Sequence, residues 1–158
     1  MKAYRRLAQR IAASRSFSWL GPHVVTPLDK LLGARMPNPT TTGTGLEVLR
    51  LTTVGRRSAR PRTSPLVYLE ADDGGYVVFG TNFGGRRHPG WTYNLDQEPS
   101  ATVSLTGGRT VAVTARRAGP GESDRHWARL LEVWPPYEEY RKRAGHRDIR
   151  IYVLEPRG

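Results

Sequence analysis

The 158-residue chain contains no cysteine. Disulfides, thiolate nucleophiles, iron–sulfur clusters and cysteine-ligated zinc are therefore excluded, and any redox function must use a bound cofactor. Apolar runs extend for only a handful of residues, far below the ~20 that span a bilayer. The basic amino terminus is not followed by an apolar segment of signal-peptide length, so we expect a cytoplasmic protein.

The usual catalytic and metal-binding patterns are also missing. The four histidines, His23, His88, His126 and His146, are scattered without the spacing of a metal site, so we predict none. No Gly-x-Ser-x-Gly nucleophile motif occurs, and no Gly-x-Gly-x-x-Gly run follows a strand pattern. The common hydrolase and nicotinamide-binding classes are not indicated.

Basic residues are abundant, and almost all of them are arginines. The chain has 25 Lys and Arg residues against 14 Asp and Glu, a formal net charge of +11, and only three lysines. This bias fits a polyanionic partner, but a GC-rich genome would also enrich arginine without a functional cause. The length and the 37% hydrophobic content fit one globular domain.

The amino-terminal third differs from the remainder. Residues 2–14 have helical amphipathic periodicity, and residues 2–20 as a whole could lie on an anionic membrane surface or pack on the domain. A second short helix is expected at 24–34. The segment 37–45, rich in Pro, Thr and Gly, predicts a linker. We therefore divide the chain into an N-terminal helical segment (1–36), a linker (37–45) and a compact domain (46–158).

The compact domain has the pattern of a mainly β fold with helices. Six strands are expected, at 46–54, 66–71, 76–81, 101–105, 110–115 and 149–154. Tight turns at 72–75 and 106–109 join two pairs of them, which favours an antiparallel sheet closed into a small barrel. Helical insertions are expected at 89–96 and from a Ser-Asp cap over 123–133.

An arginine-rich run between the first two strands is the strongest functional signal. Gly55 permits a positive φ and close approach of a ligand, and four arginines follow it at 56, 57, 60 and 62. Guanidinium groups bind phosphate or carboxylate oxygens two at a time, and the hydroxyls of Ser58 and Thr63 add donors. The run predicts an anion-binding turn; a solvated basic loop is the alternative.

Two further clusters accompany this run. Residues 82–89, Asn-Phe-Gly-Gly-Arg-Arg-His-Pro, leave a strand and open a helix, where backbone N–H groups and the helix dipole could face an anion. In Trp-Pro-Pro-Tyr-Glu-Glu-Tyr (134–140), Tyr137 and Tyr140 share a helix face. Their phenols could flank a planar ring or donate a proton, or could simply pack.

Taken in order, the motifs resemble a known family. Leu-x-Thr-Thr-x-Gly-Arg-Arg-Ser-x-x-Pro-Arg-Thr-x-Pro-Leu, Asn-x-Gly-Gly, His-Pro-x-Trp-x-x-Asn-Leu, Trp-Pro-x-Tyr-x-x-Tyr and Val-Leu-Glu-Pro together resemble the deazaflavin-dependent nitroreductases. The likeness spans residues 46–156. It implies a split β-barrel and hydride transfer from reduced coenzyme F420, an 8-hydroxy-5-deazaflavin, to quinones, nitroaromatics and related small-molecule acceptors.

The resemblance also implies which residues form the site. The implied cofactor-binding residues are Gly55, Arg56, Arg57, Ser58, Arg62, Thr63, Pro65, Leu66, Val67, Asn82, Gly84, Gly85, Arg87, Trp91 and Asn94. The implied acceptor-binding residues are Trp134, Tyr137 and Tyr140, and the two tyrosines are the candidate catalytic groups.

The chain departs from the family pattern at four positions. Ala59 replaces a usual glycine, Thr92 a common aromatic residue, Trp134 a frequent tyrosine, and the segment Asp148-Ile149-Arg150-Ile151 lacks the usual Ile-Pro. These changes predict an altered acceptor pocket more than an altered cofactor.

Two other functions remain open at this stage. One is a flavin mononucleotide enzyme of similar fold, and the other is a basic barrel that binds single-stranded nucleic acid. The phosphodiester and polyglutamate tail of F420 suit the many arginines better. The tryptophans and the paired tyrosines lie in the helical insertions rather than on strand faces, which argues against base stacking. We therefore expect no nucleic-acid partner.

Overall fold

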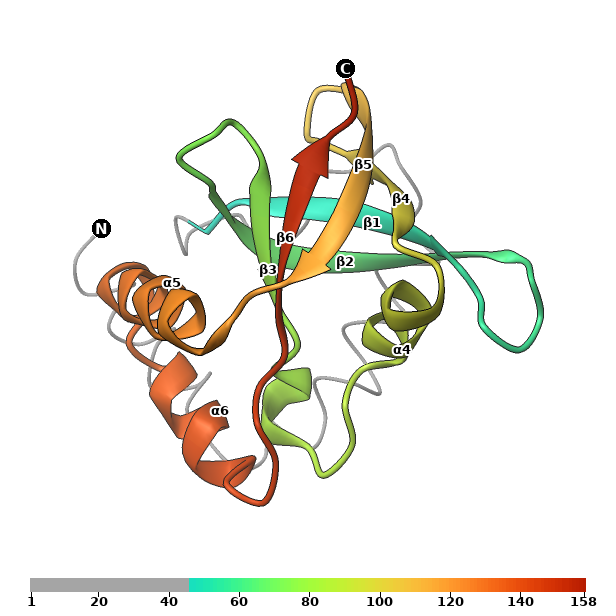
Figure 1. Cartoon of the computed structure of the whole chain (residues 1–158). Coiled ribbons are helices and arrows are strands. Elements are labelled where there is room, and N and C mark those ends of the chain that lie inside the picture. The colour runs from blue at the N-terminus through green and yellow to red at the C-terminus, as the bar shows by residue number, and fades with distance from the viewer. Residues whose placement is uncertain (1–45) are drawn as a thin grey trace.

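The computed structural model describes residues 46–158 (Figure 1). The strands are β1 (Val48–Val54), β2 (Pro61–Glu70), β3 (Tyr76–Phe79), β4 (Ser100–Ser104), β5 (Thr110–Arg117) and β6 (Ile151–Pro156). The helices are a 3-10 turn η3 (Asn82–Gly84), α4 (Gly90–Gln97), α5 (Pro120–Val133) and α6 (Tyr137–Arg143). In this part of the chain no helix is long and apolar enough to cross a membrane. The predictions for residues 1–45, including membrane binding by residues 2–20, lie outside the described residues.

The six strands close into one antiparallel barrel in the order β1-β2-β3-β6-β5-β4, with β4 pairing back to β1. This confirms the predicted six-stranded antiparallel barrel. One boundary was wrong. Strand β2 begins at Pro61 rather than Leu66, because Arg62 and Thr63 pair with Thr53 and Thr52 of β1. Part of the basic run is therefore strand rather than connection.

Along strand β1, every second side chain points into the barrel and helps to fill its core. Leu49 and Leu51 point inward and are fully buried, as the two-residue period of a strand requires. Thr53 continues this face and is 2% exposed, so a hydroxyl is buried at the end of an otherwise apolar row. A buried hydroxyl needs a hydrogen-bond partner, and helix α4 supplies it, as described below.

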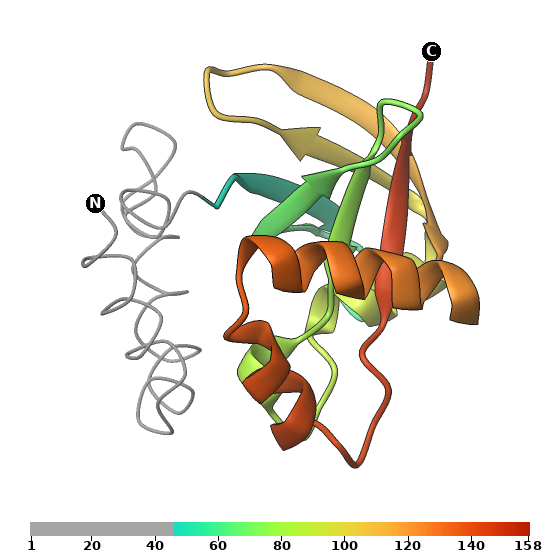
Figure 2. The ribbon, with the colours of Figure 1, turned by 90° about the vertical axis from the view of Figure 1, so that its left-hand side faces the viewer.

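Strands β3 and β6 lie side by side and are buried on both faces. Their inward residues join the barrel core, whereas Val77, Phe79 and Ile151 pack outward against Trp127 and Leu130 of α5. Figure 2 shows α5 lying across the outside of the barrel, with α6 beyond it. This double burial explains why both strands have continuous apolar runs rather than alternation.

Helix α4 is packed into the barrel core. Trp91 and Leu95 join the interior cluster, and the Trp91 ring lies 5.4 Å from the ring of Tyr152 on β6. The Tyr152 hydroxyl donates to Asp96 Oδ1 at 2.6 Å and is 3.2 Å from the carbonyl oxygen of Thr92. Because these contacts join α4 to β6, the position of α4 is set by the barrel itself.

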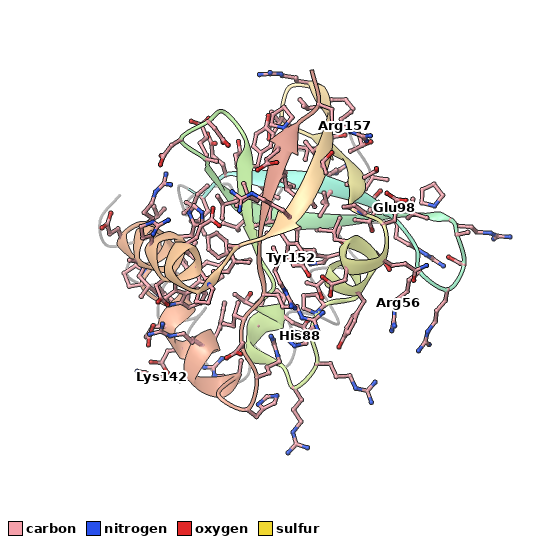
Figure 3. All side chains as sticks on the ribbon, in the orientation of Figure 1. Arg56, His88, Glu98, Lys142, Tyr152 and Arg157 are labelled. Atoms are coloured by element: carbon pink, nitrogen blue, oxygen red, sulfur yellow. The ribbon has the colours of Figure 1, made fainter. Side chains whose placement is uncertain are left out.

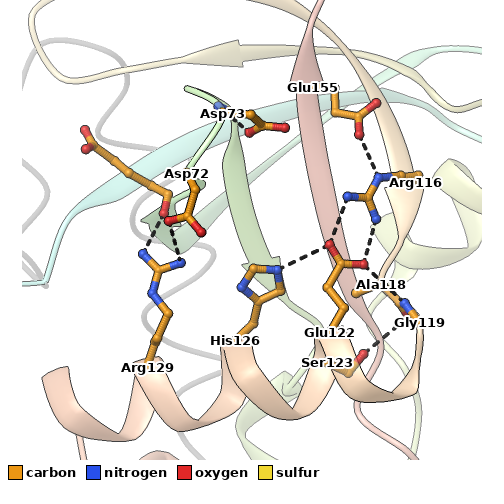
Figure 4. Close-up of polar contacts among 12 residues, drawn as sticks. Asp72, Asp73, Arg116, Ala118, Gly119, Glu122, Ser123, His126, Arg129 and Glu155 are labelled. Carbon is orange, nitrogen blue, oxygen red and sulfur yellow. Dashed lines mark hydrogen bonds and ion pairs between the residues drawn. The ribbon is translucent and has the colours of Figure 1, made fainter.

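Polar contacts attach α5 to the barrel (Figure 4). Arg116 of β5 donates to both carboxylate oxygens of Glu122, at 2.7 and 2.9 Å, and to Glu155 at 2.6 Å. These hydrogen bonds from Arg116 lower the pKa of Glu122 to about 2. The helix begins at Pro120 after Gly119, so the predicted start at a Ser123 cap was wrong. Proline is favoured in this first turn because its missing N–H would have no helical partner.

The turn between β1 and β2 contains the main backbone strain of this hairpin. Ala59 has a φ of 51°, a left-handed conformation that favours glycine. Gly55 has no positive φ, contrary to the prediction; it is required instead by space, because a Cβ there would lie 2.7 Å from Ser58 Oγ and 3.0 Å from the Arg60 carbonyl oxygen. The sequence departure at Ala59 thus places a methyl group where the backbone prefers none.

Replacing Ala59 with glycine should stabilise the fold. A left-handed residue with a Cβ costs about 1–2 kcal/mol, and the extra unfolded-state freedom of glycine offsets about 0.5–1 kcal/mol of that relief. We expect a net gain of about 0.5–1 kcal/mol in the free energy of unfolding, measured by urea denaturation. The matched control is Ala112→Gly, in exposed mid-strand β5 without a positive φ, which should lose about as much. A loss of stability in both variants would contradict strain at Ala59.

Candidate functional site

The arginine turn, residues 55–62, closes on itself through its backbone. The Gly55 N–H donates to the Arg60 carbonyl oxygen at 2.8 Å, and the N–H groups of Ser58 and Ala59 donate to the Gly55 carbonyl oxygen at 3.2 and 2.7 Å. Arg62 Nη2 lies 3.4 Å from Ser58 Oγ. The close packing around Gly55 therefore shapes a compact loop from which the arginine side chains project.

The charges of this turn have no counter-charge among the described residues. Arg56, Arg57, Arg60 and Arg62 are all exposed. None of them takes part in the ion pairs found between residues 46 and 158, all of which involve basic groups elsewhere. Four guanidinium groups on one loop without a carboxylate form a local positive field that an anionic ligand would neutralise.

Asn94 joins this turn to helix α4. Its side-chain Oδ1 accepts the Arg56 backbone N–H at 3.1 Å, and its Nδ2 donates to Thr53 Oγ1 at 2.9 Å. Asn94 is only 7% exposed; its bond to Thr53 is buried and its bond to Arg56 is partly buried. Arg56 and Asn94 are 38 residues apart in the chain, so this amide joins the arginine turn to the later predicted cofactor residues. Figure 3 shows Arg56 beside α4.

Tyr93 extends the contact between the same two regions, and sequence reasoning missed it. The Arg56 guanidinium lies 4.6 Å from the centre of the Tyr93 ring, and the Arg150 guanidinium lies 4.7 Å from it. Arg150 also forms an ion pair with Asp96 at 2.9 Å. Arg150 thus supports α4. The only sequence signal for Tyr93 was its place inside the Trp-x-x-Asn motif, between Trp91 and Asn94.

The second predicted cofactor segment folds differently from expectation. The N–H groups of Gly84 and Gly85 donate to the carbonyl oxygens of Thr81 and Asn82, so neither amide is free to face an anion. Gly84 has a φ of 78°, and a Cβ there would lie 2.8 Å from the Tyr140 carbonyl oxygen. The glycine therefore allows η3 to approach α6. Arg87 remains exposed and Asn82 half-buried.

Arg147 holds this loop in place, a role that no sequence motif indicates. Its guanidinium donates to the carbonyl oxygens of Gly85 at 2.9 Å, Gly80 at 3.2 Å and Thr81 at 2.7 Å. The three acceptors are more than 60 residues away in the chain. Planar guanidinium geometry suits such multiple acceptors, so Arg147 fixes the loop that carries Asn82 and Gly84.

The predicted acceptor residues gather against α5, η3 and β2. The rings of Tyr137 and Tyr140 are 5.3 Å apart and nearly perpendicular, and Tyr140 lies 5.9 Å from Phe83. Trp134 packs with Val67 of β2 and with Tyr137. Tyr140 is 5% exposed and Trp134 is 3% exposed, whereas Tyr137 is half-buried. Of the three, Tyr137 is the most exposed.

Burial raises the pKa of both phenols. That of Tyr140 rises to about 12, an effect partly opposed by the positive charge of Arg143. The pKa of Tyr137 also rises, first because of burial and then because of Tyr140. Both groups therefore stay protonated near neutral pH, where they can donate hydrogen bonds but are weak acids.

The predicted site residues thus form two groups connected by β2. Gly55, Arg56, Arg57, Ser58 and Asn94 lie at one end; Val67, Gly84, Trp134, Tyr137 and Tyr140 lie at the other. The residues from Arg62 to Val67 run between the groups, roughly 17 Å along an extended strand. No residue of β2 is fully buried. Trp91 stands apart, because it is 5% exposed within the barrel core.

Comparison with known proteins identifies the family of the chain. A family model described as F420H(2)-dependent quinone reductase matches residues 33–156. An F420H(2)-dependent quinone reductase of Mycobacterium tuberculosis (strain H37Rv) is 32% identical over 114 residues, which span 69% of this chain and 73% of that protein. The solved structure of an F420-H2 dependent reductase, FDR-A, has a TM-score of 0.61 at 29% identity and covers 69% of this chain and 94% of its own. A solved domain-swapped dimer has the same TM-score and identity; the match covers 69% of this chain and 80% of that chain.

These matches confirm the resemblance seen in the motifs: the chain belongs to the F420H(2)-dependent quinone reductase family, is a deazaflavin-dependent reductase, and uses coenzyme F420 as its cofactor.

Proposed function

We propose that this protein transfers a hydride from reduced F420 to a quinone, nitroaromatic or similar conjugated acceptor held beside Tyr137. The observation that carries the proposal is the arrangement of the two groups along β2. One group offers unpaired cations, and the other offers aromatic rings with protonated phenols. Such an arrangement suits a long ligand with an anionic end and a planar ring.

The residues present fit F420 at its anionic end. Arg57 and Arg60 are exposed and have no counter-charge among the described residues, and the compact turn around Gly55 holds them on one loop. We assign the phosphodiester and acidic tail to the arginine turn, with Arg57 as the central contact. The bond between Asn94 and the Arg56 N–H holds that turn in one shape before any ligand arrives, which lowers the entropy cost of binding.

At the aromatic end, the chain has to orient an acceptor and shield it from water. Bound F420H2 supplies the hydride, so the protein needs only position, a dry surface and a proton donor. We propose that the Tyr137 hydroxyl hydrogen-bonds to the acceptor oxygen and passes it a proton once hydride transfer has made that oxygen basic, since the raised pKa makes the phenol a weak acid toward the neutral acceptor. Tyr140 is more deeply buried and orients Tyr137 by ring packing at 5.3 Å.

The two alternative functions are not favoured. Stacking on single-stranded nucleic acid needs exposed aromatic rings, yet Trp91, Trp127 and Trp134 are only 3–5% exposed. A flavin mononucleotide would place one phosphate on a turn that carries four arginines without a described counter-charge, whereas the acidic tail of F420 would engage more of them.

The first test concerns cofactor binding by Arg57. Replacing it with alanine removes a charge-assisted contact and should weaken F420 binding by about 1.5–3 kcal/mol, at least tenfold in dissociation constant. Binding is measured by titrating the protein and following cofactor fluorescence. Affinity for F420 should exceed that for flavin mononucleotide and fall as salt rises.

Arg109→Ala is the matched control, because Arg109 is an exposed arginine in the turn between β4 and β5. It changes the net charge equally and should leave the F420 dissociation constant within about twofold of wild type, as distant exposed charges are screened. Equal losses in the two variants would show that net charge, not the arginine turn, governs binding. An unchanged Arg57→Ala variant would move the anion site elsewhere.

The second test concerns proton donation by Tyr137. A positioned acid contributes roughly 10²–10⁴-fold, so Tyr137→Phe should lower turnover by that range with F420H2 and menadione while leaving cofactor affinity intact. Tyr140→Phe keeps the ring packing and should have a smaller effect on turnover. A rise in KM alone would assign Tyr137 to acceptor binding. If both variants keep wild-type kcat and KM, the tyrosines are packing residues only.

A further inference from the structure

A groove of about 800 Å³ lies between the start of α5 and the segment that leads into β6. Its walls come from four regions: the end of β5, the first half of α5, Arg141 of α6, and residues 147–151, with His88 at one end. A volume of this size is typical of small-molecule sites. None of the predicted cofactor or acceptor residues lines it.

Four arginines line the groove, and two of them are already neutralised. Arg141 forms an ion pair with Glu138 at 2.9 Å, and Arg150 forms one with Asp96 at 2.9 Å. Arg147 donates hydrogen bonds to three carbonyl oxygens and to His88 Nδ1 at 3.2 Å, with no carboxylate within ion-pair distance among the described residues. Its positive charge is therefore held in place without being neutralised.

Arg117 is the groove arginine whose side chain has no partner among the described residues. It is exposed, and no hydrogen bond or ion pair joins its side chain to another described residue. Arg117 pairs with Tyr152 across β5 and β6, so both side chains leave the same face of the sheet. Since the Tyr152 hydroxyl reaches Asp96 on α4, Arg117 leaves that face beside Arg150 and His88. Figure 3 shows His88 below Tyr152, between α4 and α6.

The pKa of His88 shows that the electrostatic potential in the groove is positive. Its pKa is lowered first by burial and then by Arg150, Arg147 and Arg117, with Asp96 acting in the opposite direction. Three guanidinium groups therefore act on one imidazole and outweigh the nearest carboxylate. A bound anion would reduce this repulsion, which gives the groove a reason to prefer negative ligands.

The remaining lining limits the ligand's chemistry. Trp127, Ile149 and Ile151 form an apolar floor, and Trp127 and Ile151 are almost fully buried. Asp124 and Asp148 are exposed at the groove, and their carboxylates would repel a second negative charge on the ligand. We propose that this groove is a separate binding site for a small aromatic monocarboxylate, whose carboxylate contacts Arg117 in the positive field of Arg147 and whose ring lies on the Trp127 and Ile149 floor.

The test uses 1-naphthoate as the probe and the full-length protein. Titration calorimetry should show saturable binding, and the neutral analogue 1-naphthylmethanol should bind at least tenfold more weakly, because it lacks the charge. Arg117→Gln should weaken naphthoate binding five- to tenfold while leaving F420 binding unchanged. On naphthoate binding, the His88 pKa measured by NMR should rise.

Two control variants separate this site from the cofactor site. Arg109→Gln removes an exposed charge outside the groove and should leave naphthoate affinity unchanged. Arg57→Gln should weaken F420 binding and leave naphthoate affinity unchanged. No saturable binding at millimolar probe, or equal affinity of wild type and Arg117→Gln, would overturn the proposal. Loss of naphthoate binding in Arg57→Gln would place the probe in the cofactor site and would also overturn it.

Discussion

The buried side-chain amide of Asn94 is the contact on which the site depends. It accepts the Arg56 backbone N–H at 3.1 Å and donates to Thr53 Oγ1 at 2.9 Å, so one residue links the last inward position of β1, the arginine turn and helix α4. Leaving such a buried group unpaired costs about 1–3 kcal/mol, so the three elements have one favourable arrangement. Because α4 is itself packed in the barrel core, the turn is anchored to that core.

The arginines of this chain have two kinds of role. Arg116 and Arg147 hold elements together, through carboxylates in one case and carbonyl oxygens in the other. Arg56 and Arg57 are exposed and keep their charge available to a ligand. A net charge of +11 cannot distinguish these roles, because both contribute equally to it. Only the positions of the acceptors show which guanidinium groups are free.

Much of the fold could be predicted because its signals are local. The alternation in β1 and the turns at 72–75 and 106–109 each depend on neighbouring residues, so strand number and barrel closure were predictable. The start of β2 could not be predicted in this way. Pairing with β1 extends the strand back to Pro61, although the sequence there is exposed and basic. Similarly, Ser123 and Asp124 resemble a cap, but the helix begins three residues earlier at Pro120.

The motifs identified the segments of the site, but not how they are joined. The bond from Asn94 to Thr53 spans 41 residues, and the contacts of Arg147 span more than 60. No short sequence pattern encodes such pairs. Tyr93 could not be identified as a functional candidate for the same reason, since its two guanidinium neighbours come from opposite ends of the domain. The aromatic residues were found, but their unequal burial became visible only once α6 was packed against η3.

The most direct measurement of the central claim is the F420 dissociation constant of Asn94→Ala across a range of salt concentrations, with folding verified by circular dichroism. If Asn94 acts by holding the arginine turn in its binding shape, affinity should fall about tenfold, the equivalent of about 1.4 kcal/mol. The salt dependence should stay that of wild type, because all four arginines remain. Wild-type affinity in a folded Asn94→Ala protein would contradict the claim, and so would a loss of the salt dependence.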